Sequence, residues 1–286
     1  MRNQLPGTSA PPAVMPPAPQ LALEAYWLLR RHAGVYAGQV LALAAVCWLA
    51  LIVVGIVFDL GTAHASIEFR IVFLQATYIA AFVAVLVLGG TAIFISCQRA
   101  IVLDRPPAVR DALRLRPSDR RVLRGVCVYW LVVHLVPTVV VNGAYIAQAL
   151  GLPFLQMPKA VAFAFYWGWV LATAPLVVLS LPITLFEAAA DPLAEGRRRL
   201  DGNIGRMVVA SALAFAPIAI VDIALELLQD AYASADEGTR LLLDVLAMPL
   251  LQAASSLATI LVMSALVAAV YLRLSPRLDS VYRVFD

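Results

Sequence analysis

Three ionisable residues stand inside long apolar runs of this sequence, where they could do chemistry within a membrane. His134 lies near the middle of one run, and Asp222 and Glu226 lie four residues apart near the end of another. Ionisable residues are rare in membrane-spanning helices and often mark ion or proton pathways. His134 could relay protons, because histidine changes its charge near neutral pH. An isolated histidine also hydrogen-bonds neighbouring helices, and both interpretations stay open.

Asp222, Glu226 and Asp230 recur every four residues and therefore share one face of a helix. Their carboxylate oxygens could hold a divalent cation or admit protons. The alternative interpretation is a solvated helix end that opens into an outer vestibule. The three cysteines are too far apart for a Cys-rich metal motif. We therefore predict no resident metal and no cofactor, and leave open whether the acidic face binds a cation.

Groups of arginines suggest a second kind of chemistry, the binding of anionic lipid headgroups. They lie in short amphipathic segments that each precede an apolar run, at residues 21–32, 106–116 and 187–206. An arginine near a membrane surface contributes about 1 kcal/mol of attraction to anionic lipid. The predicted headgroup contacts are Arg30, Arg31, Arg110, Arg114, Arg197, Arg198 and Arg199. The alternative interpretation is that these arginines only determine topology.

The third segment, residues 187–206, has clear helix boundaries. Asp191 can cap free amide groups, Pro192 suits the first helical position, and Gly202 can take the left-handed conformation that ends a helix. Leu193 and Leu200 are seven residues apart, which predicts one apolar face on a helix at the membrane surface.

The two earlier segments follow the same plan. Val109, Ala112 and Leu113 have helical spacing, after a proline pair that suits a helix start. In the first segment Tyr26 and Trp27 are aromatic anchors, since their amphipathic rings favour the headgroup level.

The elements that position these residues are predicted to be membrane helices. The chain has 286 residues, is 62% hydrophobic and only 14% charged, which is more apolar side chain than a soluble core can hide. A helix needs about 20 residues to cross a hydrocarbon layer of about 30 Å. We predict an all-α polytopic membrane protein with six transmembrane helices, at residues 35–58, 71–97, 122–146, 161–186, 207–228 and 241–272.

The distribution of basic residues predicts the orientation. Only Arg70, Lys159 and Arg240 fall on one face, and the other eighteen of the 21 basic residues fall on the face that holds both termini. Basic residues near helix ends stay in the cytoplasm, so both termini are predicted to be cytoplasmic. Arginine supplies all but one of the basic residues and alanine is abundant, which suggests a high-GC bacterial genome.

The surface segments recur at a fixed spacing. They end near Arg31, Arg116 and Asp201, 85 residues apart both times. This period predicts three parallel hairpin units, each preceded by a short cytoplasmic amphipathic helix. The units cover residues 21–105, 106–190 and 191–275 of a single domain, 21–286, which follows a disordered Pro-rich tail, 1–20.

The residues around the third segment resemble a known family. One span ends in Pro182-Ile-Thr-Leu-Phe-Glu187, an Arg-rich helix follows, and Leu200-Asp-Gly-Asn203 leads into the next span. With Arg99-Ala-Ile-Val-Leu-Asp104 at an earlier junction, this arrangement resembles the glycerophosphoryl diester phosphodiesterase membrane-domain family of bacterial inner-membrane proteins. The resemblance implies a membrane domain alone, since a catalytic barrel needs about 250 further residues.

The functional prediction rests on the membrane topology and on missing motifs. The sequence has no phosphate-binding Gly-Lys loop, no Gly-x-Ser-x-Gly elbow and no HExxH motif. We expect a non-enzymatic scaffold or accessory module linked to lipids or envelope homeostasis, with anionic headgroups on the cytoplasmic face as partners and no nucleic acid. The alternative is a small transporter or channel that uses His134, Asp222 and Glu226, and a third option is an intramembrane enzyme of lipid metabolism.

Overall fold

The fold is a bundle of helices, seen in a computed structural model. The structure describes residues 15–61, 67–113, 115, 119–130, 132, 133, 136, 140, 159–187, 189, 191–232 and 247–275. Within this part of the chain every regular element is helical, which confirms the predicted all-α class. The elements are α1 (Ala18–Arg30), α2 (Ala33–Gly61), α3 (Ile67–Val102), η1 (Val109–Leu113), α4 (Arg120–Trp130), α6 (Lys159–Val178), α7 (Ser180–Phe186), α8 (Pro192–Leu200), α9 (Ile204–Tyr232) and α11 (Met248–Leu274).

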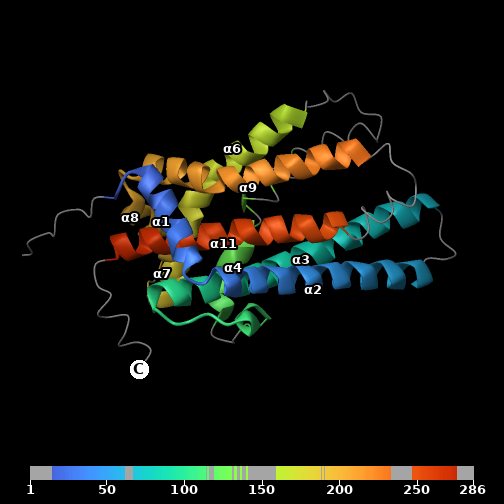
Figure 1. Ribbon diagram of the computed structural model, residues 1–286, viewed down its shortest axis with the longest axis horizontal. Helices are drawn as coiled ribbons and strands as arrows, with labels where there is room; N and C mark the ends of the chain where they lie inside the picture. The colour runs from blue at the N-terminus through green and yellow to red at the C-terminus, as the bar shows by residue number, and fades with distance from the viewer. Residues whose placement is uncertain are drawn as a thin grey trace, which may run out of the picture.

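Helix α11 forms the centre of the bundle. It packs against α2, α3 and α9, and α1 crosses α9 and α11 at one end (Figure 1). Every residue from Leu261 to Tyr271 is buried. Ser264, Ala265 and Ala268 are 0% exposed, and such small side chains let neighbouring helices approach closely.

Three helices, rather than the predicted six, are long and apolar enough to cross a membrane within the residues that the structure describes. They are Ala33–Val54, Ile204–Leu225 and Leu250–Leu274, and Val87–Val102 in α3 is a shorter apolar helix. The sixfold count is therefore corrected to three candidate spans over this part of the chain. The three-hairpin arrangement stays a prediction.

The predicted span at 161–186 is broken into two helices. Helix α6 ends at Val178, and α7 begins at Ser180 and has only seven residues. Pro182 has no backbone N–H and so cannot bond the carbonyl of Val178, four residues earlier. Of the predicted span at 122–146, the structure gives α4 to Trp130, and most of the remainder lies outside the described residues.

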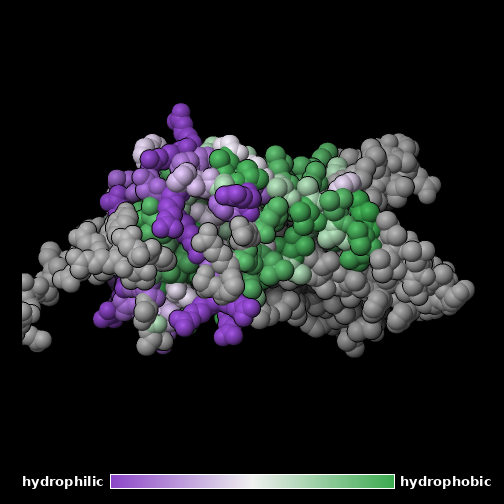
Figure 2. Space-filling model, turned by 90° about the horizontal axis from the view of Figure 1, so that it is seen from below, coloured by the Kyte–Doolittle hydropathy of each residue, from purple (hydrophilic) through white to green (hydrophobic). Residues whose placement is uncertain are grey.

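Charged and apolar side chains occupy different parts of the surface. Charged residues gather at the end that carries α1 and α8, and the flank beyond it is apolar (Figure 2). Large apolar side chains are exposed on both sides of the bundle, at Leu49 and Val53 on α2 and at Ile220 and Leu227 on α9, with exposures from 53% to 67%. This separation is typical of a helical bundle that sits in a lipid layer.

The packed structure starts earlier than the predicted tail allows. Met15 is 1% exposed, and its carbonyl accepts a hydrogen bond of 2.9 Å from Arg206. Helix α1 then begins at Ala18. Residues 15–20 therefore belong to the folded part, while residues 1–14 lie outside the described range.

Candidate functional site

The boundaries of helix α8 are as predicted. The Asp191 carboxylate accepts hydrogen bonds from the amides of Leu193 (3.1 Å) and Ala194 (3.0 Å). Pro192 is the first residue of the helix. Gly202 has φ +73°, the left-handed conformation that glycine adopts without strain.

The predicted apolar face of α8 is correct for only half of the helix. Leu200 is 0% exposed, but Leu193 is 53% exposed. A Cβ atom at Gly196 would lie 3.2 Å from the backbone nitrogen of Ser180, so the helix approaches the start of α7 closely there. The second half of α8 is therefore docked on the bundle, and only its first turn presents a leucine outward.

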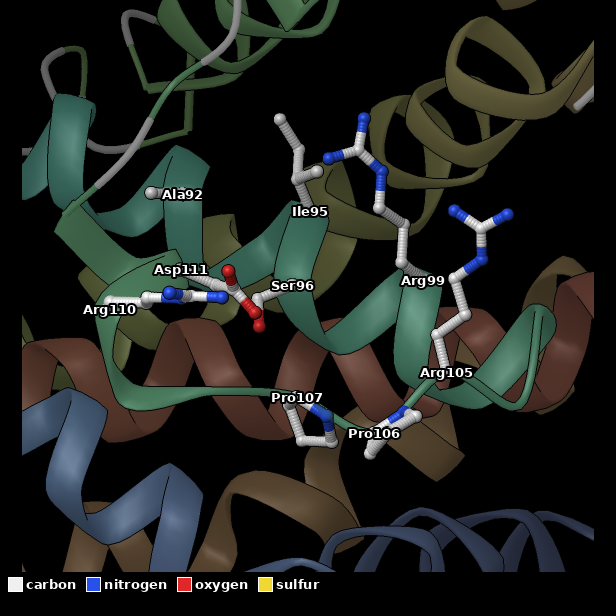
Figure 3. Close-up of a pocket in the computed structure, with 9 residues that line it drawn as sticks. All are labelled: Ala92, Ile95, Ser96, Arg99, Arg105, Pro106, Pro107, Arg110 and Asp111. Atoms are coloured by element: carbon white, nitrogen blue, oxygen red, sulfur yellow. The ribbon is translucent and has the colours of Figure 1, made fainter.

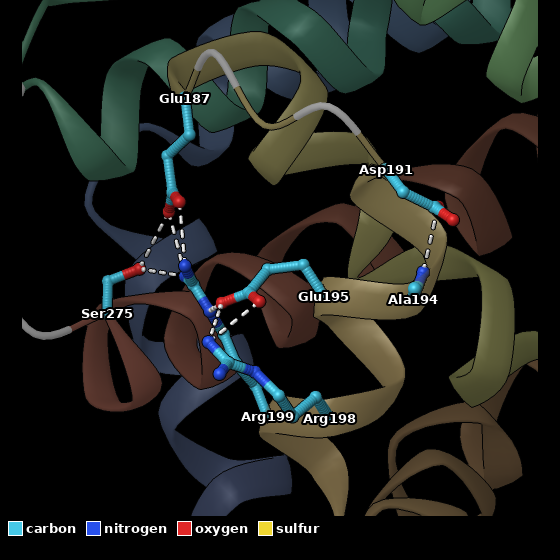
Figure 4. A network of polar contacts seen from close by, with 7 residues as sticks. All are labelled: Glu187, Asp191, Ala194, Glu195, Arg198, Arg199 and Ser275. Carbon is cyan, nitrogen blue, oxygen red and sulfur yellow. Dashed lines mark hydrogen bonds and ion pairs between the residues drawn. The ribbon is translucent and has the colours of Figure 1, made fainter.

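Arg199 lies at the centre of an ion-pair network (Figure 4). Its guanidinium forms ion pairs of 2.7 Å with both Glu187 and Glu195, and its side chain is only 13% exposed. Glu187 also accepts a hydrogen bond of 2.8 Å from the Tyr271 hydroxyl. The network thus joins the end of α7, helix α8 and the end of α11. Arg199, predicted to contact headgroups, here fastens three elements together.

The network is ionised at neutral pH. Hydrogen bonds from Arg198 and Arg199 lower the pKa of Glu195. Burial alone would raise the pKa of Glu187, but the hydrogen bonds from Arg199 and Tyr271 outweigh it, and the net pKa is lowered. The hydrogen bond to Glu187 raises the pKa of Arg199 against the opposing effect of burial. Both carboxylates therefore favour the charged form that holds Arg199.

The remaining predicted headgroup arginines that the structure describes are on the surface. Arg198 pairs with Glu195 at 2.8 Å and Arg31 pairs with Asp104 at 3.0 Å, with both arginine side chains largely exposed. Such exposed pairs are weak and exchange readily with other anions. Among the residues that the structure describes, three other predicted headgroup arginines have no carboxylate partner to exchange. Arg30, Arg110 and Arg197 are exposed and form no ion pair within the described part of the chain, while Arg114 lies outside it.

A cavity of about 210 Å³ lies between α3 and the loop that leads into η1 (Figure 3). The predicted helix at 106–116 is a single 3-10 turn, Val109–Leu113, in which the Asp111 carboxylate accepts a hydrogen bond of 2.9 Å from the Ala108 amide. The cavity is lined by Ala92, Ile95, Ser96, Arg99, Arg105, Pro106, Pro107, Arg110 and Asp111. Only Arg110 was a predicted site residue. For the two further arginines, Arg99 and Arg105, the available signal was the density of arginines in this one connection.

Two buried glutamines hold the charged end together, and the sequence patterns did not single them out. Gln39 on α2 donates to the Ser96 hydroxyl (2.9 Å) and to the Ala108 carbonyl (2.8 Å). Gln98 on α3 donates to the Ser264 carbonyl on α11 at 2.8 Å. Both glutamines are 0% exposed. These bonds fix the cavity loop to α2 and fix α3 to α11.

The predicted intramembrane site has one side chain that the structure describes. Asp222 on α9 accepts a hydrogen bond from the Ser255 hydroxyl on α11. His134 and the side chain of Glu226 lie outside the described positions. Among the residues that the structure does describe, no group of three or more His, Cys, Asp or Glu side chains could hold a metal ion.

Comparison with known proteins identified no relative of this chain. No family model, no curated protein and no solved structure matches this chain. The resemblance to the glycerophosphoryl diester phosphodiesterase membrane-domain family therefore stays a prediction.

Proposed function

We propose that this chain is a membrane-embedded, non-enzymatic scaffold or accessory module whose charged end lies among anionic lipid headgroups. The observation that carries the proposal is that charged side chains gather at one end of the molecule (Figure 2), whereas large apolar side chains are exposed along α2 and α9. Ile220 on α9 is 67% exposed, and contact between water and such a side chain on a long apolar surface is unfavourable.

Helix α1 supports the same placement of the charged end. Its inner face packs on the bundle through Leu21 and through the Tyr26 hydroxyl, which donates to the Ala214 carbonyl at 2.6 Å. Its outer face presents Leu23 and Trp27, which are 70% and 66% exposed. An outward tryptophan beside arginines suits the boundary between headgroups and acyl chains.

The finer proposal keeps the arrangement in parallel hairpins, with both termini on the cytoplasmic side of a bacterial inner membrane. It is supported by the excess of basic residues on one predicted face. The role we propose is linked to lipids or envelope homeostasis. Membership of the phosphodiesterase membrane-domain family is part of this proposal.

Lipid analysis of the purified protein tests the function. After extraction in a mild detergent, we expect phosphatidylglycerol to be enriched over its share of the source membrane. Substitution of Arg30, Arg197 and Arg198 by glutamine should lower that enrichment, because these exposed side chains carry the attraction. A retained lipid composition equal to that of the bulk membrane would contradict the proposal.

A small transporter or channel is the second candidate, favoured by Asp222. This carboxylate lies within the candidate span Ile204–Leu225 and bonds Ser255 on the neighbouring span. An ionisable group in such a position often lines an ion or proton path. Proteoliposomes with a pH-sensitive dye would test it: proton flux that Asp222→Asn abolishes would favour transport over the scaffold.

A further inference from the structure

The cavity between α3 and η1 carries an excess of positive charge. Arg99, Arg105 and Arg110 line it together with one carboxylate, Asp111. Arg99 pairs with Asp119 at 2.8 Å through one guanidinium nitrogen, and its other N–H groups take no part in that bond. Arg105 and Arg110 form no ion pair within the described part of the chain.

The Asp111 carboxylate is already committed to the loop itself. One of its oxygens accepts the hydrogen bond from the Ala108 amide, which closes the turn into η1. Its charge therefore offsets only part of the charge of the arginines. In Figure 3 the side chains of Arg99 and Arg105 extend next to each other in the same direction, and Arg110 lies at the other end of the loop near Asp111.

The loop is held in a fixed shape without a ligand. Asp104 has φ +49°, a left-handed conformation that turns the chain sharply after α3. Pro106 and Pro107 follow, and their rings fix the backbone φ angles. Gln39 then bonds the Ala108 carbonyl from the buried side. Such preorganisation lowers the entropic cost of binding.

The cavity also has an apolar wall that leads toward the membrane flank. Ala92 and Ile95 line it from α3, two turns and one turn respectively before Arg99 on a shared face. Leu88, one turn further along α3, is 49% exposed. The apolar wall is thus continuous with a surface that faces lipid in the proposed placement.

We propose that this cavity binds one phosphate group, that of an anionic phospholipid headgroup. Arginine guanidinium groups bind phosphate oxygens through paired hydrogen bonds, and three of them surround this space. At about 210 Å³ the cavity is smaller than the pockets of about 300 Å³ and more that enclose drug-sized ligands, so it suits a headgroup rather than a whole lipid. The choice of a lipid source rests on the proposed function, since it needs this end to lie at headgroup depth.

The test compares two pairs of arginines with equal charge. Arg105→Gln/Arg110→Gln removes two charges from the cavity, and Arg120→Gln/Arg121→Gln removes two exposed charges from helix α4, outside the cavity and outside the predicted headgroup contacts. Native mass spectrometry of the detergent-purified protein with added phosphatidylglycerol counts the bound lipid. We expect one tightly bound lipid, whose occupancy falls about tenfold in the cavity variant and persists in the control pair.

A second experiment, with soluble phosphate compounds, distinguishes a lipid headgroup from free phosphate as the ligand. Inorganic phosphate and glycerol 3-phosphate are titrated calorimetrically into the same detergent-purified proteins. Binding of these anions that depends on Arg105 and Arg110, without a retained lipid, would support the phosphate site and count against the lipid-binding function.

The variant Arg105→Lys/Arg110→Lys is the control for loss of folding in the cavity variant. It keeps the charge and should recover part of the binding. Thermal unfolding of all variants shows whether the bundle is intact. Equal binding of lipid and of soluble phosphate by the cavity variant and by the control pair would overturn the site. So would the absence of both ligands from the unmodified protein.

Discussion

At the residue scale, three consecutive arginines have different environments. Arg197 is exposed, Arg198 pairs with Glu195 on the surface, and Arg199 is 13% exposed between two carboxylates. An exposed arginine is available to an anionic headgroup, whereas a largely buried one with two partners stabilises the fold. The difference comes from which face of α8 turns toward α7 and α11.

Arg199→Gln should destabilise the protein more than Arg198→Gln. Loss of the Arg199 charge leaves Glu187 partly buried without its ion pair, and we expect a cost of about 2 kcal/mol after solvent screening. The exposed Arg198 pair should contribute less than about 0.5 kcal/mol. Thermal unfolding in detergent micelles measures both, and equal shifts of Tm would show that the network does not fasten the helices.

The same network predicts sensitivity to acid. The folded protein lowers the pKa of Glu187 and Glu195 below their ordinary value of 4.5, so it binds fewer protons than the unfolded chain at these sites. Their contribution to stability is full above pH 4.5 and is lost as the pH falls through the lowered folded values. Tm measured from pH 7 downward should therefore drop less steeply in Glu187→Gln/Glu195→Gln. Parallel curves for the two proteins would refute the assignment.

Sequence reasoning at this scale found the local features and missed the distant ones. The cap by Asp191 and the left-handed Gly202 follow from short-range rules, and both are confirmed. The partners of Arg199 include Glu187, twelve residues away, and Ser275 on α11, 76 residues away. The tertiary packing of α8 brings those side chains together, so no local sequence pattern predicts the contact.

At the element scale, α8 approaches α7 closely at Gly196, where an added Cβ atom would lie 3.2 Å from the backbone. Gly196 packs against the backbone at Ser180, where a side chain cannot be displaced to make room. Gly205 in α9 has open space around its Cβ position. The two glycines therefore form a matched pair.

Gly196→Val should destabilise the protein by about 2 kcal/mol, as overpacking of a close contact does. Gly205→Val should change the stability by less than about 0.5 kcal/mol, since it meets no neighbouring atom. Chemical denaturation followed by circular dichroism compares the pair. If Gly196→Val matched the control, the docking of α8 on α7 would be incorrect.

The elements themselves were predicted unevenly. All three surface segments contain helical structure, at α1, η1 and α8. The predicted α-helix at 106–116 is instead a short 3-10 helix, Val109–Leu113, whose start is capped by Asp111. Helices α6 and α7 divide the predicted span at 161–186 where Pro182 leaves the Val178 carbonyl without its helical donor.

At the scale of the whole molecule, the charged end is a packed structure rather than a set of separate surface helices. Tyr26 bonds Ala214 on α9, and Glu24 pairs with Arg273 on α11 at 3.1 Å. These contacts join residues about two hundred positions apart or more, so a pattern read along the chain predicts the helices but not how α1 crosses them. Composition did predict the apolar flank.

The central claim is that the apolar flank lies in lipid while the charged end lies in water and headgroups. Spin labels test it on a background in which Cys47, Cys97 and Cys127 are replaced by alanine. One label is placed by Ile220→Cys on the flank and another by Arg197→Cys at the charged end, in phosphatidylglycerol-containing nanodiscs. Both positions are exposed on the protein surface.

Power-saturation electron paramagnetic resonance then reports the access of oxygen, which concentrates in lipid, and of a water-soluble nickel complex to each label. The account predicts that the label at 220 is accessible to oxygen and shielded from nickel, and that the label at 197 is accessible to nickel. Free access of nickel to the label at 220 would place the flank in water and contradict the account.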